Sequence, residues 1–158
     1  MAKRSAGILL YRGRGAELRL LLVHPGGPFW AKKDLGAWSI SKGEYEEGKD
    51  PLAVARREFE EELGAPAPAG DAIELGELVQ PSRKVVAAYA IKGDFDPSRL
   101  KSNLFEMEWP PKSGRLQSFP EVDRAAWFTV EKACEKILPG QRPFIDRLLE
   151  RLGQQLDA

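Results

Sequence analysis

The sequence has very few of the residues that build disulfide bridges and zinc sites. Among its 158 residues, Cys134 is the only cysteine and His24 is the only histidine. An intramolecular disulfide and a zinc site of the Cys/His type are therefore excluded. A single cysteine is typical of a reducing compartment, so we expect a cytoplasmic protein. We interpret Cys134 as a buried apolar residue and His24 as a structural residue.

Long apolar runs are also missing. The N-terminal segment has a run of only five apolar residues before Tyr11, which is too short for the core of a signal peptide. Nothing in the sequence approaches the roughly 18–20 consecutive apolar residues that span a bilayer. We therefore expect neither a signal peptide nor a membrane partner.

A charge excess of either sign is absent, because 24 basic residues balance 24 acidic residues. Without a global positive field, nucleic acid is not expected as a partner. The acidic residues are nevertheless concentrated between residues 44 and 62, which suits a cation better than a polyanion. The length and the 42% hydrophobic content predict a single globular domain over residues 1–158.

The apolar patterns predict alternating strands and helices, and hence an α/β or α+β fold. Strands are expected at 5–11, 17–24, 37–40, 72–79, 84–92, about 103–109 and 124–128. Helices are expected from Pro51 to Gly64, from 130 to 138 and from 143 to 156, with Asp50 as the N-cap of the first. Loops 25–36 and 93–120 are expected to border the site.

The expected helices also predict which side chains face the core. In the first helix these are Leu52, Ala55, Phe59 and Leu63. In the last helix they are Phe144, Leu148, Leu149, Leu152 and Leu156.

The first helix carries three carboxylates on one face. Glu58, Glu61 and Glu62 stand at positions i, i+3 and i+4, and the outer two are about 6 Å apart along the helix axis. Crowded carboxylates have raised pKa values unless a cation neutralises them, and Mg²⁺ prefers oxygen ligands. A solvated acidic helix face is the usual meaning of such a charge run, so this pattern alone would favour a solvated face over a metal site.

The surrounding residues resemble the Nudix box, the signature of a family of hydrolases. Seven residues fall in register with it: Gly43, Arg57, Glu58, Phe59, Glu61, Glu62 and Gly64. Two positions of the box, which spans residues 43–65, depart from the signature: Lys49 replaces a glutamate and Ala65 replaces a bulky apolar residue. The pattern extends over a loop and a helix, so it favours a metal site over a solvated face.

The resemblance implies a Nudix fold, which is an α/β/α sandwich around a mixed sheet with the box as loop, helix and loop. It implies Mg²⁺-dependent hydrolysis of a phosphoanhydride bond in a nucleoside diphosphate linked to another group, with Mn²⁺ able to replace Mg²⁺. Glu58 and Glu62 are the strongest ligand candidates, and Glu61 is either a ligand or the group that polarises water. Arg57 orients the carboxylates, so Glu61, Glu58 and Arg57 form the expected catalytic set.

Further site residues are expected outside the box. Glu121, six residues before Trp127, matches the position of an additional metal ligand in the family; Asp123 competes with it, and a plain polar turn is the alternative. The residues expected to contact substrate are Lys42, Trp30, Lys84 and Tyr89. Phe29, Trp38 and Trp109 are further stacking candidates, and Lys32, Lys33 and Arg83 are further phosphate-binding candidates. For each one, core packing or ordinary surface charge is the alternative.

The segments SAGILLYR and KVVAAY and the spacing from Glu121 to Trp127 are similar to the MutT-like, dinucleoside polyphosphate hydrolase branch. Dinucleoside polyphosphates are therefore the first substrate class, with nucleoside triphosphates and ADP-ribose open. Because Lys49 departs from the signature, a non-catalytic nucleotide-binding or regulatory module is the alternative function; Glu46 or Glu47 would have to replace the missing glutamate. Dimers are common among similar proteins, so a homodimer is allowed.

Overall fold

A mixed β-sheet forms the centre of the molecule. The computed structural model describes the backbone of residues 3–157 and the side chains of residues 3–153. The main sheet of this part contains β1 (Arg4–Arg12), β2 (Arg19–Pro25), β3 (Ser41–Tyr45), β4 (Ala72–Val79), β5 (Val85–Lys92) and β8 (Val122–Thr129). Its order is β4-β5-β1-β2-β8, and β3 pairs with the first half of β1. Only the β1–β5 pairing is parallel among these strands.

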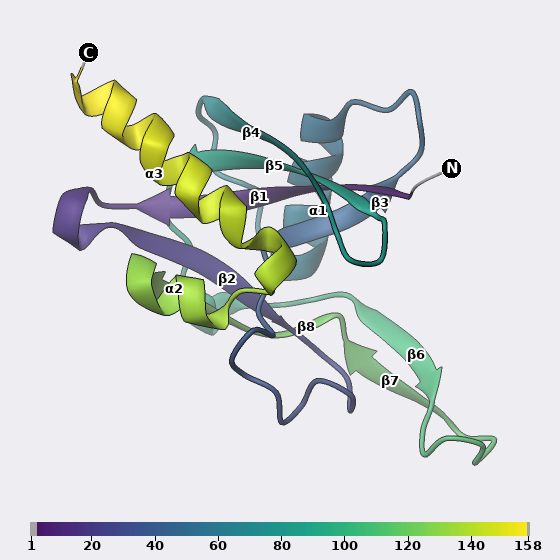
Figure 1. Ribbon diagram of the computed structural model, residues 1–158. Coiled ribbons are helices and arrows are strands. Elements are labelled where there is room, and N and C mark those ends of the chain that lie inside the picture. Colours follow the sequence, from purple (N-terminus) through teal and green to yellow (C-terminus); the bar gives the residue numbers. More distant parts are fainter. Residues whose placement is uncertain (1–2, 158) are drawn as a thin grey trace.

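Helices cover both faces of this sheet (Figure 1). The helix α1 (Pro51–Leu63) packs against β1 and β3 on one face. On the other face, α2 (Val130–Lys136) packs against β2 and β8, and α3 (Arg142–Asp157) packs against β4. This arrangement confirms the predicted α/β/α sandwich around a mixed sheet. In the described part of the chain, no helix has the length and apolar character needed to cross a membrane.

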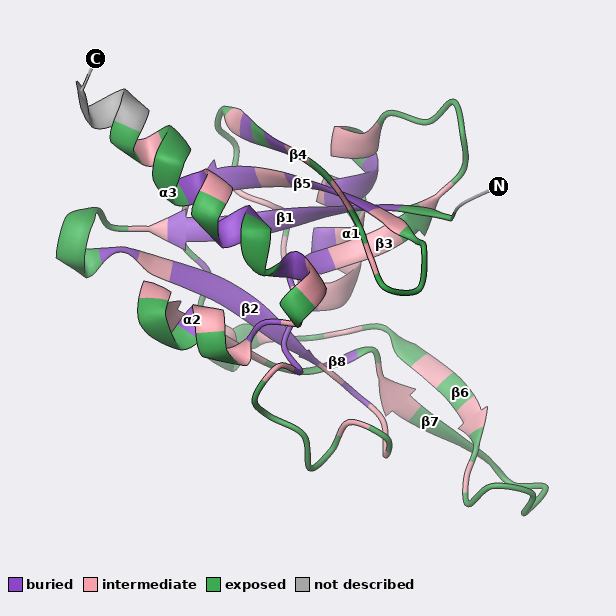
Figure 2. Ribbon diagram, viewed as in Figure 1, coloured by how far each residue is buried: buried purple, intermediate pink, exposed green. Residues whose placement is uncertain are grey.

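Strand β1 is buried on both faces, as its purple colour in Figure 2 shows. Successive side chains of a strand point to opposite faces. Leu9 accordingly packs in the cluster that contains Phe144 and Leu148 of α3. Leu10 packs in the cluster that contains Phe59 of α1. The two helical layers are therefore held by alternate residues of the same strand, which fixes α1 against the sheet.

The helix α1 begins and ends where its sequence predicts. Asp50 caps it, because the Asp50 carboxylate accepts a hydrogen bond from the Leu52 N–H at 3.3 Å. Gly64 ends it in the left-handed conformation at φ 82°, and its N–H donates to the Glu60 carbonyl at 2.8 Å. The buried residues of α1 are Val54, Ala55, Phe59 and Leu63. Leu52, predicted to face the core, is only half-buried.

The prediction of a strand at residues 37–40 was wrong. Here the described backbone makes only isolated bridges, from Ser39 to Val23 and from Trp38 to Ile137, and the strand begins at Ser41. A side chain takes the place of a strand partner, because the amide oxygen of the buried Gln141 accepts a hydrogen bond from the Ile40 N–H at 3.0 Å. Residues 37–40 are therefore held by single bridges to β2 and to Ile137, and by Gln141 just before α3, rather than by a continuous strand ladder.

The segment 93–120 is more ordered than the long loop that the sequence predicted. It contains a hairpin of β6 (Leu104–Glu108) and β7 (Leu116–Pro120), which projects from the body of the molecule (Figure 1). The strand expected at 103–109 is thus present, whereas β7 was missed. The residues of β7 are exposed or half-buried, so they lack the alternation of apolar and polar residues that identifies a strand.

The last helix follows its predicted pattern with one exception. Phe144 and Leu148 are fully buried, and Leu152 packs against the same core. Leu149 was predicted to face inward, but it is 38% exposed. It directly follows Leu148, and adjacent helical residues point about 100° apart, so Leu149 falls outside the buried stripe. The predicted inward position of Leu156 lies outside the described side chains.

Candidate active site

The glycine that opens the box allows β3 to lie directly against α1. Gly43 pairs with Ala6 of β1, and a Cβ atom added to Gly43 would overlap the carboxyl group of Glu58. Gly43 lies within a strand and its φ is not positive, so it does not form a turn. Gly43 is therefore required for close approach, and only Gly64 is required for its left-handed backbone.

We expect Gly43→Ala to reduce nucleotide hydrolysis by about tenfold while the fold is retained, because the new methyl group must displace the Glu58 carboxylate. Steady-state kinetics and thermal unfolding measure the two effects. Gly153→Ala is the matched control, since Gly153 is an exposed residue of α3 and a Cβ atom there meets no neighbour within 4 Å. A Gly43→Ala enzyme with unchanged activity would show that Glu58 tolerates displacement.

Glu62 is the carboxylate held deepest against β3. Its Oε1 atom accepts a hydrogen bond from the Lys42 N–H at 3.2 Å. Burial raises the pKa of Glu62 to about 7, whereas the nearby Ser41 hydroxyl and Lys42 lower this pKa. Within the described residues, the buried Ser41 hydroxyl has no partner at hydrogen-bond geometry. Glu62 therefore holds a charge that its protein surroundings leave under-compensated.

Glu58 and Glu61 share one arginine. Arg57 donates a hydrogen bond from Nη2 to Glu58 at 3.4 Å, and its Nε lies 3.9 Å from Glu61 Oε1. The Glu58 side chain is 15% exposed and that of Glu61 is 41% exposed. Burial raises the pKa of Glu58, and the charge of Glu61 raises it further. The arginine thus stabilises both carboxylates without removing their mutual repulsion.

The carboxylate of Glu121 joins this group from the residue between β7 and β8. Burial raises the pKa of Glu121, and the charges of Glu58 and Glu61 raise it further. Asp123, the competing candidate, is engaged elsewhere: its Oδ1 lies 2.8 Å from His24 Nδ1 and 3.7 Å from Arg124 Nε. The geometry therefore favours Glu121 over Asp123 as a partner of the box.

The chemistry of this donor set fits a hard divalent cation. Glu58, Glu61, Glu62 and Glu121 supply only carboxylate oxygens, which are the ligands of Mg²⁺ and Mn²⁺. Among residues 3–153, no three Asp, Glu, His or Cys side chains converge in metal-ligand geometry. Glu58, Glu62 and Glu121 nevertheless each lie close enough to another glutamate of the set for its charge to raise their pKa. A bound dication would remove this repulsion.

A cavity of about 210 Å³ adjoins two of these carboxylates. Glu62, Glu121, Lys42 and Trp30 are among its lining residues. Its remaining walls are mostly apolar: Val23, Pro25, Ala37, Ser39, Ile40, Val122 and Leu138. Burial lowers the pKa of Lys42, and the charge of Glu62 opposes this effect. The cavity therefore combines acidic groups, one amine and one indole ring in an otherwise apolar hollow.

Two predicted substrate residues do not line this cavity. Lys84 lies 3.2 Å from Glu44 in an exposed ion pair. Tyr89 lies on β5 and packs against the core on the α1 side. Ser39 and Ser41 are the polar residues of this region that sequence reasoning did not select. Only the position of Ser41 beside Lys42 and Gly43 could have indicated it.

Lys49 occupies the turn before α1, and its N–H donates to the Glu46 carbonyl at 3.2 Å. Within the described part of the chain, Arg57 forms its ion pairs with Glu58 and Glu61, and neither Glu46 nor Glu47 pairs with it. The acidic partners of this arginine are therefore the box carboxylates themselves.

The order of these features along the chain matches a known family. A family model described as the NUDIX domain covers residues 1–148. The chain belongs to the Nudix family. It is thus a Nudix hydrolase, an enzyme that acts on acid anhydride bonds, which confirms the enzyme class predicted from the sequence. Nudix enzymes generally use divalent metals and act on nucleotide substrates.

Several proteins are similar to this Nudix chain. An octanoyltransferase from Myxococcus xanthus is 29% identical over 134 residues, which are 85% of this chain but 33% of that protein. The chain thus spans about a third of the length of this relative. An RNA pyrophosphohydrolase from Rhodospirillum rubrum is 26% identical over 157 residues, 94% of this chain and 90% of that protein. The crystal structure of a C. elegans Ap4A hydrolase binary complex shares the fold, with a TM-score of 0.66 and 18% identity over 95% of this chain and 98% of that one.

Proposed function

We propose that this Nudix hydrolase cleaves a phosphoanhydride bond in a nucleoside diphosphate linked to another group, with Mg²⁺ as cofactor. The observation that carries the proposal is the cavity in which Glu62 and Glu121 meet Lys42 and Trp30. Dinucleoside polyphosphates are the proposed substrate class. We further propose that residues 1–158 act as one catalytic domain.

Each carboxylate has a proposed task. Glu58, Glu62 and Glu121 would hold the metal. Bound Mg²⁺ neutralises phosphate charge and lowers the pKa of a water ligand. Arg57 orients the carboxylates of Glu58 and Glu61, which it contacts directly. Glu61 is the more exposed of the two, and we assign it the proton of the attacking water.

The cavity walls supply the proposed substrate contacts. Lys42 lines the cavity beside the acidic groups. Once a metal neutralises those groups, the Lys42 amine would bind phosphate oxygens. Trp30 stacks on a nucleobase. Lys84 and Tyr89 do not line the cavity, so we propose no substrate contact for them. Support for a nucleoside polyphosphate comes from two similar proteins, which are named RNA pyrophosphohydrolase and Ap4A hydrolase.

A nucleotide panel tests this function. The purified chain is incubated with diadenosine tetraphosphate, ATP and ADP-ribose, with Mg²⁺ or with EDTA, and the nucleotide products are separated and quantified. We expect Mg²⁺-dependent cleavage, fastest for the dinucleotide. Tight nucleotide binding without any product would instead support the non-catalytic module, and turnover unaffected by EDTA would contradict the role of a metal.

A further inference from the structure

We propose that a second nucleoside-binding surface lies beside the cavity and holds the distal nucleoside of a dinucleoside polyphosphate. Phe29, Trp109 and Arg115 form it, and we refer to these three residues as the aromatic surface. The inference rests on the proposed function, because it names the substrate class of the same site. Phe29 comes from the loop after β2, and the other two residues come from the β6–β7 hairpin.

The two rings of the aromatic surface contact each other but remain open to ligand. Phe29 and Trp109 meet edge to face, with their centroids 5.4 Å apart and an interplanar angle of 82°. Phe29 is 59% exposed, and Trp109 is half-buried. Adjoining exposed aromatic side chains form an apolar patch, and such patches can mark binding sites. The exposed parts of these two rings are therefore accessible to a ligand.

Charge is segregated between the two faces of the hairpin. The Trp109 N–H donates to the Arg115 carbonyl at 3.0 Å, so these residues oppose each other across the hairpin and their side chains share one face. Because side chains alternate along a strand, Glu106 and Glu108 belong to the opposite face. The face with the rings thus carries a guanidinium group, and the reverse face carries the carboxylates. A base attached to phosphate matches this combination.

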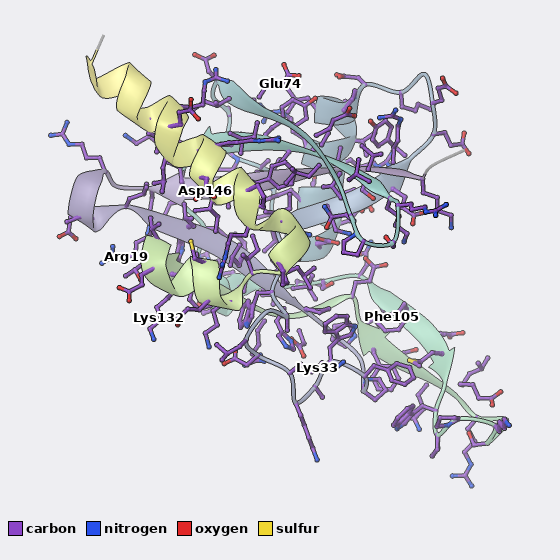
Figure 3. All side chains as sticks on the ribbon, viewed as in Figure 1. Arg19, Lys33, Glu74, Phe105, Lys132 and Asp146 are labelled. Carbon is purple, nitrogen blue, oxygen red and sulfur yellow. The ribbon has the colours of Figure 1, made fainter. Side chains whose placement is uncertain are left out.

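The aromatic surface is linked to the cavity through the chain itself. Phe29 directly precedes Trp30, which lines the cavity, and Lys33 Nζ lies 5.0 Å from the centroid of the Trp30 ring. Phe29 therefore adjoins a residue of the cavity wall in the sequence, and Lys33 places a cation beside that wall. Figure 3 labels Lys33 on this loop and Phe105 on β6.

Close backbone packing holds the loop against the hairpin. The Gly26 N–H donates to the Glu121 carbonyl at 2.9 Å, and the Glu121 N–H donates to the Asn103 carbonyl at 2.8 Å. A Cβ atom at Gly27 would lie 2.9 Å from the Phe105 ring. The aromatic surface is thus fixed relative to Glu121, one of the proposed metal ligands.

The size of the cavity indicates why a second surface is needed. Its volume of about 210 Å³ lies below the roughly 300–1,000 Å³ of typical small-molecule pockets. A cavity of this size is too small for two nucleosides, so the second nucleoside of a dinucleoside polyphosphate would bind outside it. The aromatic surface offers stacking for that base and a guanidinium group for an adjoining phosphate.

Substrate comparison tests the aromatic surface. We expect Trp109→Ala to lower kcat/KM for diadenosine tetraphosphate about tenfold, which equals about 1.4 kcal/mol, mainly through KM. ATP, which lacks a second nucleoside, should be cleaved at the wild-type rate. Trp109→Phe retains an aromatic ring and should restore most of the affinity. Leu116→Ala is the matched control, since Leu116 is an exposed residue of the same hairpin outside the aromatic surface.

Three results would overturn the inference. The first is that Trp109→Ala leaves the cleavage of both substrates unaffected, and the second is that it impairs both equally. The third is that it impairs only the cleavage of a 5′-triphosphorylated diribonucleotide, in which case the surface serves an RNA end. If the wild-type protein cleaves neither nucleotide, the proposed function fails, and calorimetric binding of diadenosine tetraphosphate tests the surface separately. Weaker binding by Trp109→Ala than by Leu116→Ala would then support the surface, and equal binding would overturn it.

Discussion

Glu62→Gln is expected to lower kcat/KM for nucleotide hydrolysis by about 10²–10³-fold, the loss typical when one electrostatic group of an active site is removed. Glutamine keeps the shape of the side chain and can still accept the Lys42 N–H hydrogen bond of 3.2 Å, so the fold should survive. It removes the negative charge that the proposed metal site needs. Steady-state kinetics with saturating Mg²⁺ measure the loss.

Glu60→Gln is the matched control for this variant. Glu60 lies on the same helix, is exposed and lies outside the cavity. The two substitutions change net charge and helix composition identically, so a general electrostatic effect would appear in both. Similar activity in the two variants would refute a special role for Glu62.

Without divalent metal, the protein should become less stable as the pH rises from about 4.5 to about 7. Burial raises the pKa of Glu62 from 4.5 to about 7, so in this interval the folded state holds a proton that the unfolded state has released. Linkage then gives a loss of about 3 kcal/mol in the free energy of unfolding across the interval, from about 1.36 kcal/mol per pH unit. The raised pKa values of Glu58 and Glu121 act in the same direction.

Urea unfolding in EDTA at several pH values measures this dependence. Glu62→Gln should flatten the curve and be more stable than the wild type at pH 8, whereas Glu60→Gln should follow the wild-type curve. Adding Mg²⁺ at pH 8 should restore stability to the wild type, because a metal that binds the folded state stabilises it. A wild-type stability that rises between pH 4.5 and 7 would contradict the burial of Glu62.

The elements that the sequence predicted well are those with local signals. The helix α1 has its cap at Asp50 and its stop at Gly64, and both act within a few residues. The strand at 37–40 was predicted wrongly, because the partner of the Ile40 N–H is Gln141, a residue 101 positions away. The strand β7 was missed because its exposed and half-buried residues lack an alternating pattern, and its hairpin is held instead by contacts to the loop after β2.

The candidate site also contains residues that local signals predict and residues that depend on long-range contacts. Spacing along one helix was enough to group Glu58, Glu61 and Glu62. The substrate residues depended on strand order, which the sequence does not reveal. Tyr89 lies on β5, on the other side of β1 from β2 and β8, whose residues Val23 and Val122 line the cavity. Of the four predicted substrate residues, Trp30 and Lys42 line the cavity.

Calorimetric titration with Mn²⁺ tests most directly whether these carboxylates bind a dication. The wild type, Glu60→Gln and Glu62→Gln are titrated at pH 8 without nucleotide. We predict that the wild type and Glu60→Gln bind Mn²⁺ with equal affinity and that Glu62→Gln binds at least about tenfold more weakly. Equal affinity in all three proteins would contradict the proposal that Glu62 and its neighbours form a metal site.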